Sequence, residues 1–292
     1  MSIGQERAEA LRQAYNHCAA LARDRARDFW LGALFAPEGA RPHLHALAAF
    51  EAEIARVRAA VREPLAGEMR LAWWREALAG ARDAEVSSHP VAAALIDTKA
   101  KFALPAQAFE DLLQARIFDL YDDPMPTLAD LEAYCRQTAS ALFALAALVL
   151  GEGRDLGAAE ASEAAGLAVG LTQALRTFPQ ASARGQVYLP REMLERHGVS
   201  VEDVRARRDG AGLRAALGEL REIAERRLVE AQTRVAALPA ILAPAFVPLG
   251  AVRLDLKRLK RAEASPFAPF AEAPAWRRQL ALWLWARGRR GA

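Results

Sequence analysis

The chain has 292 residues, with 39 Lys and Arg against 36 Asp and Glu, so its formal net charge of +3 is small for its length. A balance this even lacks the basic stripe that nucleic-acid binding requires, and we expect no nucleic acid among its partners. Only Cys18 and Cys135 are present, far apart and outside any CxxC pair, which argues against a disulfide framework or a thiolate metal site.

Two stretches bear on membranes. The N-terminal segment MSIGQERAEALRQAY carries Glu6 and Glu9 and has no apolar signal core, so we expect neither secretion nor a transit peptide. The longest apolar run, residues 141–151, is shorter than the ~20 residues of a membrane span, and we expect a buried helix there. The chain is therefore expected to be soluble, with contact at a membrane surface left open.

Helical periodicity runs through nearly every segment, and almost none alternates as a strand does. Gly and Pro separate the periodic stretches, which predicts an all-α protein of about ten helices without a linker. Ala-rich helices over 44–60, 128–150 and 158–177 are expected inside a bundle. Thr127 with Asp130, and Ser200 with Asp203, have the spacing of capping boxes at helix starts.

The ordinary catalytic motifs GxSxG, HExxH and the P-loop are missing. His43 and His45 are two residues apart and point to different sides of a helix, so a surface or helix-start role is expected. Asp24 and Asp28 stand one helical turn apart among arginines, which predicts a solvated surface.

A second DxxxD pattern joins Asp119 to Asp123. Asp123 precedes a proline, which disfavours helix at that residue, so the two carboxylates are not expected on one helix face. Asp119 alone can face a cavity, cap a helix or pair with a cation.

Four segments carry a family resemblance: LHALAAFEAEIARVR, MRLAWWREAL, LEAYCRQTASAL and GLTQALRTFPQASARGQVYLPREML. Their order and spacing resemble the squalene/phytoene synthase family over residues 29–194. The resemblance implies one domain, 1–292, with an all-α, isoprenoid-synthase-like helical bundle around a central cavity. In catalytic members of that family, two Asp-rich helices bind Mg²⁺, which holds the diphosphates of two prenyl substrates during head-to-head condensation.

Both Asp-rich motifs have lost their carboxylates in this chain. Ala55, Arg56 and Ala59 stand at the first motif, and Thr177 and Ala181 at the second. A diphosphate leaving group needs metal ions to neutralise its charge, so the loss of both pairs predicts no catalytic residues, no metal ligands and no cofactor.

The pattern of loss most resembles one branch of the family, whose members assist the assembly of respiratory complex I. That branch has an ELAQVK-like segment, comparable to EIARVR here, and an LRATPxxxxRxxVFLP-like segment, comparable to LRTFPQASARGQVYLP. Pro179 in the second segment is expected to end or kink the helix. The branch implies a complex I subunit or assembly intermediate as partner, in the cytoplasm or the mitochondrial matrix, peripheral to the inner membrane.

The resemblance places several candidate ligand-binding side chains in the former diphosphate region: Glu53, Arg56, Asp119, Gln173, Arg176, Arg184 and Tyr188. Arg176 and Arg184 either bind a phosphate or acidic headgroup, or form ion pairs. Arg56 either repels metal or anchors Asp119 or Glu53 in an internal salt bridge, the alternative we favour because a buried unpaired charge is costly.

Aromatic residues at helical spacing are expected mainly in the core, including Trp73 and Trp74. Trp283 and Trp285 stand two residues apart, so one of them is expected to be exposed. The arginines that follow would assist contact with an anionic membrane or a partner.

Three functions follow from these observations: a non-catalytic family member that assists complex I assembly and retains an isoprenoid-shaped or lipid-binding pocket, an active prenyl transferase with displaced Mg²⁺ ligands, and a lipid-binding carrier. We favour the first.

Overall fold

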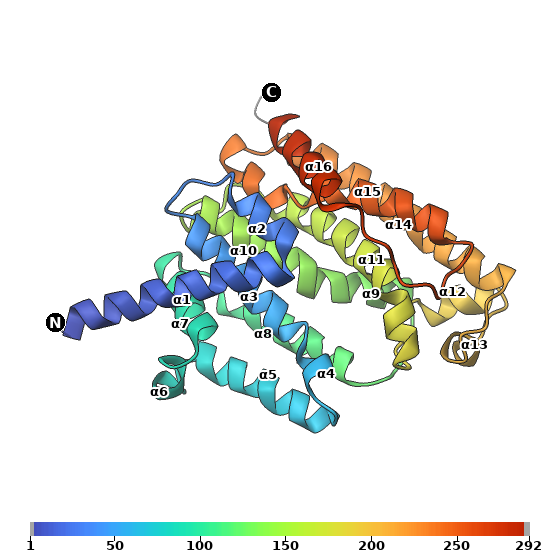
Figure 1. Ribbon diagram of the computed structural model, residues 1–292, viewed down its shortest axis with the longest axis horizontal. Helices are drawn as coiled ribbons and strands as arrows, with labels where there is room; N and C mark the ends of the chain where they lie inside the picture. Colours follow the sequence, from blue (N-terminus) through green and yellow to red (C-terminus); the bar gives the residue numbers. More distant parts are fainter. Residues whose placement is uncertain (1–2, 289–292) are drawn as a thin grey trace. The chain divides into compact units, whose positions relative to one another are not determined.

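The computed structural model describes residues 3–288, and within that range every regular element is a helix (Figure 1). The all-α prediction is confirmed. The chain forms two compact units, each assembled from separated stretches. The first unit takes the residues up to Leu120, Leu142–Ala158 and Leu238–Val247, and the second takes the remainder. The assignment of one domain to 1–292 stays a prediction.

The first unit contains ten complete helices and most of an eleventh: α1 Ile3–Arg25, α2 Arg27–Ala33, α3 Arg41–Ile54, α4 Val57–Ala60, α5 Pro64–Leu78, α6 Asp83–Val86, α7 Pro90–Lys101, α8 Ala106–Ile117, the short η1 Phe118–Leu120, η3 Ala240–Phe246, and α10 Ala141–Leu150 from its second residue. The second unit contains α9 Leu128–Cys135, the π-helical η2 Arg136–Ser140, α11 Ala159–Ala183, α12 Arg191–Arg196, α13 Val201–Arg205, α14 Ala211–Ala236, α15 Leu249–Ala262 and α16 Ala275–Gly288.

Aromatic side chains fill the core of the first unit. Phe50 of α3 packs edge-on against Trp74 of α5 and Phe109 of α8, with ring centroids 4.9 and 5.8 Å apart. Phe143 of α10 stacks on Phe246 at 5.6 Å. Edge-to-face and offset arrangements at these separations add to the free energy gained by burying the rings. The expected core position is confirmed for Trp74, which is buried.

A polar network joins α1, α3 and α7 in the same unit. The Tyr15 hydroxyl donates to Asp97 Oδ2 at 2.5 Å and lies 2.9 Å from His43 Nδ1, which in turn lies 2.9 Å from Thr98 Oγ1. His43 and its neighbour His45 are buried. A surface role for the two histidines was therefore wrong, while the position of His43 in the first turn of α3 agrees with a helix-start role.

Two glycines allow α11 to approach the preceding helix in the second unit. A Cβ at Gly166 would overlap the backbone and hydroxyl of Ser140, and one at Gly170 would lie 2.6 Å from Cys135 Sγ. Gly166 and Gly170 are four residues apart and share one face of α11, so close helix contact depends on small side chains there. The helix beneath them widens into a π turn at Arg136–Ser140.

Helix boundaries agree with the sequence in some places and differ in others. Both capping boxes form, with Thr127 and Ser200 at the N-caps. The helix expected over 44–60 is interrupted at residues 55–56, between α3 and α4. Pro179 was expected to end or kink its helix, and the ending is wrong because α11 continues to Ala183. One missing amide costs a long helix a single hydrogen bond, and the burial of Phe178 and Pro179 offsets it.

One helix within residues 3–288, Leu128–Leu150, is long and apolar enough by length and composition to cross a membrane. Its apolar half, α10, packs into the protein: Leu142, Phe143, Leu145, Val149 and Leu150 are all buried. The buried helix expected over 141–151 is confirmed.

Candidate functional site

The first family segment lies at the junction between α3 and α4. Ala55 caps the end of α3, Arg56 precedes α4, and both are exposed, as is Ala59. These three residues therefore lie on the surface around the break between the two helices. Within the described residues, Arg56 forms no ion pair with Asp119 or Glu53.

Arg116 occupies the role expected of Arg56. Its Nη2 lies 2.5 Å from Glu51 Oε1, and its Nη1 lies 3.0 Å from Asp119 Oδ2. Asp119 is buried and lies one helical turn after Arg116. The guanidinium of Arg116 is therefore the cation that the sequence places next to its carboxylate. The expectation that Arg56 anchors Asp119 was wrong, although the internal salt bridge itself exists.

Glu53 has the most perturbed carboxyl group of the candidates. Burial raises its pKa to about 7, and the charge of Arg25 opposes this rise only in part. Its Oε2 lies 3.6 Å from Nε2 of His89, whose own pKa burial lowers. Burial also raises the pKa of the nearby Cys18 thiol to about 12. A perturbed carboxyl beside an imidazole is typical of functional sites and also occurs in structural clusters.

Two tryptophans enclose this histidine. The rings of Trp73 and Trp74 lie 4.9 and 5.1 Å from the His89 ring, and Trp73 Nε1 donates to Glu85 at 2.6 Å. Sequence reasoning missed His89, which stands 36 residues from Glu53 in the chain and shares no motif with it. Its position directly before Pro90, at the start of α7, marks a helix N-cap and does not predict its partner.

The second family segment lies on α11 and the loop that follows. Gln173 is exposed, and Thr177 donates its hydroxyl to the Gln173 carbonyl at 2.8 Å. Ala181 is buried. Arg184 is exposed and has no ion-pair partner within residues 3–288, while the ring of Tyr188 lies 5.9 Å from that of Tyr134.

Arg176 belongs to a charge cluster around the buried Asp255. Its Nη1 lies 3.2 Å from Asp255 Oδ2, its Nη2 donates to Glu272, and its guanidinium lies over the Phe270 ring. Arg278 donates to both oxygens of the same Asp255 carboxylate at 2.8 and 3.1 Å. Of the two alternatives for Arg176, phosphate binding and ion pairing, the structure shows ion pairing. Sequence reasoning missed Asp255, whose one signal is its place as the sole acidic residue of a basic helix.

The seven candidates fall into two groups. Glu53, Arg56 and Asp119 belong to the first unit, and Gln173, Arg176, Arg184 and Tyr188 to the second. Throughout the described chain, no three His, Cys, Asp or Glu side chains are placed to hold a metal ion. Mg²⁺ requires a set of oxygen donors, and the residues at the two family segments do not provide one.

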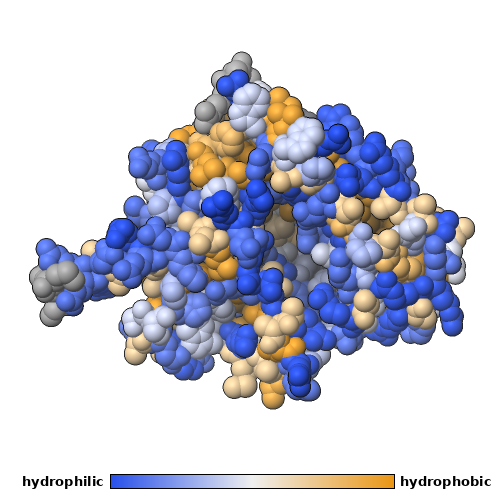
Figure 2. Space-filling model, viewed as in Figure 1, coloured by the Kyte–Doolittle hydropathy of each residue, from blue (hydrophilic) through white to orange (hydrophobic). Residues whose placement is uncertain are grey.

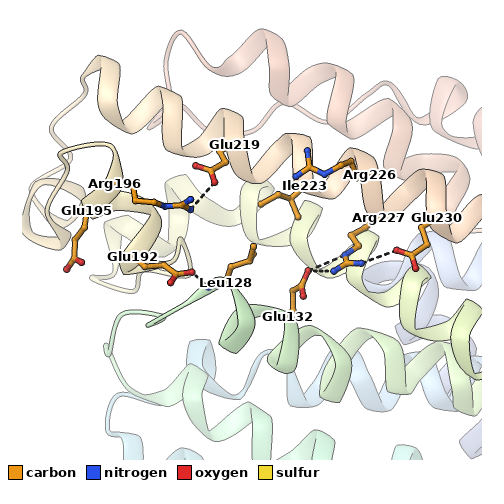
Figure 3. A pocket seen from close by; sticks show the side chains of 10 residues that line it. All are labelled: Leu128, Glu132, Glu192, Glu195, Arg196, Glu219, Ile223, Arg226, Arg227 and Glu230. Atoms are coloured by element: carbon orange, nitrogen blue, oxygen red, sulfur yellow. Dashed lines mark hydrogen bonds and ion pairs between the residues drawn. The ribbon is translucent and has the colours of Figure 1, made fainter.

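An open groove of about 1020 Å³ lies on the second unit between α9, α12 and α14 (Figure 3). Three of its carboxylates pair with its arginines: Arg227 reaches Glu132 at 2.7 Å and Glu230 at 3.0 Å, and Arg196 reaches Glu219 at 2.9 Å. The groove contains none of the seven candidates. An open groove lined by five glutamates, three of them paired with arginines, suits water better than a diphosphate or an apolar chain.

Comparisons with known proteins agree with the fold. The family model described as Squalene/phytoene synthase matches residues 22–283. The chain is 29% identical over 268 residues to NADH dehydrogenase (ubiquinone) complex I, assembly factor 6 of Rattus norvegicus, across 92% of this chain and 80% of that one.

Two solved structures share the helical fold. Squalene synthase HpnC from Alicyclobacillus acidocaldarius has a TM-score of 0.72 and 26% identity, over 88% of this chain and 97% of that one. A dehydrosqualene synthase solved with a ligand has a TM-score of 0.79 and 19% identity, over 97% and 99%. The predicted isoprenoid-synthase fold is confirmed.

Proposed function

Because the chain belongs to the squalene/phytoene synthase family, we propose that it is a non-catalytic member that assists the assembly of respiratory complex I. The observation that carries the first half of the proposal is the donor chemistry of the two family segments. The side chains at the lost carboxylate positions are Ala55, Arg56, Ala59, Thr177 and Ala181. None of them is an anionic metal ligand.

Prenyl transfer of this type separates a diphosphate from carbon, and the charge that develops must be neutralised as the bond breaks. At the second segment the available oxygens are the amide of Gln173 and the hydroxyl of Thr177, which already donates to a backbone carbonyl. At the first segment the exposed Arg56 brings positive charge. These residues do not fit Mg²⁺, so the proposed function uses no cofactor.

The role in assembly rests on the similarity to the rat assembly factor, which extends over most of both chains. The proposed partner is a subunit or assembly intermediate of complex I. The proposed location is the cytoplasm, or the mitochondrial matrix in a eukaryote, at the periphery of the inner membrane. Arg184, exposed and without an ion-pair partner in the described chain, is the candidate to receive a phosphate or acidic lipid headgroup.

A gene deletion tests the assembly role. We expect less fully assembled complex I, measured on native gels and as NADH-to-quinone activity, with both restored by a plasmid copy of the gene. Normal complex I after deletion would contradict the proposal. Complex II activity from the same membranes controls for a general loss of respiration.

A product assay tests the absence of catalysis. Purified protein with Mg²⁺ and farnesyl or geranylgeranyl diphosphate is expected to form no C30 or C40 hydrocarbon, while a squalene synthase assayed in parallel does. A product above the no-enzyme blank would support the alternative, an active prenyl transferase with displaced ligands. One observation favours that alternative: the carboxylates of Glu51 and Asp119 both contact Arg116 and so lie close together. If lipid copurifies with the protein and deletion of the gene leaves complex I unaffected, a lipid-binding carrier is favoured.

A further inference from the structure

An apolar stripe runs along the outer face of α16. Trp276, Leu280, Trp283 and Leu284 expose 61, 45, 39 and 56% of their surfaces. They occupy positions i, i+4, i+7 and i+8, so they share one face of the helix. The opposite face, with Arg278, Leu282 and Ala286, is buried. In Figure 2, orange and pale side chains gather where Figure 1 shows α16.

A basic stripe with the same spacing runs along α15. Arg253, Lys257, Lys260 and Arg261 are exposed at positions i, i+4, i+7 and i+8. The two helices pack directly on each other, and a Cβ added at Gly250 of α15 would lie 2.8 Å from the Ala281 carbonyl of α16. Apolar and basic stripes therefore belong to adjacent helices of one unit.

The exposed cations of α15 differ from most arginines of the neighbouring helix α14. Four of the five α14 arginines form ion pairs, and the exposed Arg226 is the exception within the described residues: the paired ones are Arg214, Arg221, Arg227 and Arg234. Within residues 3–288, none of the four α15 cations forms an ion pair. The sole acidic residue of α15 and α16 is Asp255, which is buried beneath Arg176 and Arg278. The outer surface of the two helices thus carries positive charge without an intramolecular counterion.

Arginines also accompany the exposed tryptophans. The Arg277 guanidinium lies 5.1 Å from the Trp276 ring centroid, and that of Arg287 lies 4.1 Å from the Trp283 ring. Indole rings and arginines together are suited to the headgroup region of a bilayer, where the ring meets the acyl boundary and the cation meets phosphate. Arg289 and Arg290, part of the basic cluster seen in the sequence, lie outside the described residues.

We propose that the α15–α16 surface, defined by these tryptophans, leucines and cations, docks on an anionic lipid bilayer. The charge argues for this occupant: an anionic membrane attracts every exposed cation of the surface at once, and the apolar stripe gains free energy by leaving water. The docking assigns a surface to the peripheral membrane contact in the proposed function. It rests on that function for its biological setting, but its test involves neither complex I nor a prenyl diphosphate.

Cosedimentation of the full chain with vesicles tests the proposal. Vesicles of phosphatidylcholine with phosphatidylglycerol are expected to bind the protein, and vesicles of phosphatidylcholine alone are not. High salt should weaken binding, because charge draws the surface to the membrane. Trp276→Ser/Trp283→Ser and Lys257→Glu/Lys260→Glu are each expected to bind about tenfold more weakly or worse.

The matched control is Leu65→Ser/Met69→Ser, which removes two exposed apolar side chains from α5 of the other unit. Circular dichroism establishes that each variant folds. Equal binding to both vesicle types, no binding to either, or equal losses in the control variant would overturn the proposal. So would a dimer that the Trp276→Ser/Trp283→Ser variant converts to a monomer, because a second copy would then cover the surface. If the vesicle experiments contradict membrane docking, the assembly role is still tested separately by the gene deletion.

Discussion

Arg176 and Asp255 form a buried ion pair, with Nη1 and Oδ2 3.2 Å apart. Asp255 is only 2% exposed and also accepts two hydrogen bonds from Arg278. One carboxylate therefore balances two guanidinium groups from α11 and α16, with Glu272 contributing a second negative charge to Arg176. The cluster thus joins three helices of the second unit, α11, α15 and α16.

Replacing Asp255 by Asn is expected to destabilise the second unit by about 3–5 kcal/mol, because Arg278 loses its carboxylate in a buried site and Arg176 keeps only the exposed Glu272. Urea denaturation followed by circular dichroism measures the loss. Asp209→Asn is the matched control, since its pair with Arg214 lies on the surface, and its effect should be far smaller. Similar losses in the two variants would show that Asp255 does not balance the cluster.

Two helical glycines of the second unit should respond in opposite directions to alanine. Gly166→Ala pushes a methyl group into the Ser140 backbone, so we expect a loss of about 1–3 kcal/mol or more. Gly218→Ala on α14 meets nothing closer than Glu263 Oε1 at 3.9 Å, so a gain of about 0.5–1 kcal/mol is expected. Thermal unfolding of both variants checks the pair, and a tolerated Gly166→Ala would contradict the close helix contact.

The Glu53 carboxyl should make stability depend on pH. Its pKa is raised from 4.5 to about 7, so the folded chain binds this proton more tightly than the unfolded chain. The contribution of Glu53 is therefore fully present below pH 4.5 and is lost as the pH rises through 7. Glu53→Gln avoids the loss, and we expect it to exceed wild type by about 2–3 kcal/mol near pH 8 and to equal it near pH 4.

Urea unfolding of wild type and Glu53→Gln at both pH values provides the measurement. The buried His43 and His45 are present unchanged in both proteins, so the difference between them reports on Glu53 together with its contact to His89. A difference that does not change with pH would mean that the carboxyl titrates normally in the folded chain.

Arg116 and Arg56 provide a direct comparison of two arginines near the first family segment. Arg116→Met leaves Glu51 and the buried Asp119 without their shared cation, and we expect a loss of about 3 kcal/mol or more. Arg56→Met changes an exposed residue and should cost no more than ~0.5 kcal/mol. If urea denaturation shows a larger loss of stability for Arg56→Met than for Arg116→Met, Arg56 is the anchor of the segment.

Local signals in the chain predicted much of the fold. The 3.6-residue periodicity predicted an all-α protein, and the Thr127 and Ser200 capping boxes form as expected. The family followed from four motifs in order. These features depend on residues within a few positions of one another, or on the linear pattern itself, so they can be read without tertiary contacts.

The partners of the charged side chains were decided by packing. Arg116 contacts Glu51 across 65 residues of sequence, and Arg176 contacts Glu272 across 96. Arg56 was adjacent to the lost motif and still proved to be exposed. Sequence proximity carries little information about such pairs, because helix packing sets which side chains meet.

The amino-acid sequence by itself determined the helical class and the family, since both follow from local pattern and residue identity. Only the tertiary structure decided that Arg116 replaces Arg56, that Pro179 lies inside a continuous helix, and that α15 and α16 present a basic and an apolar stripe. The physical reason is that burial and charge pairing depend on which surfaces of the helices come together.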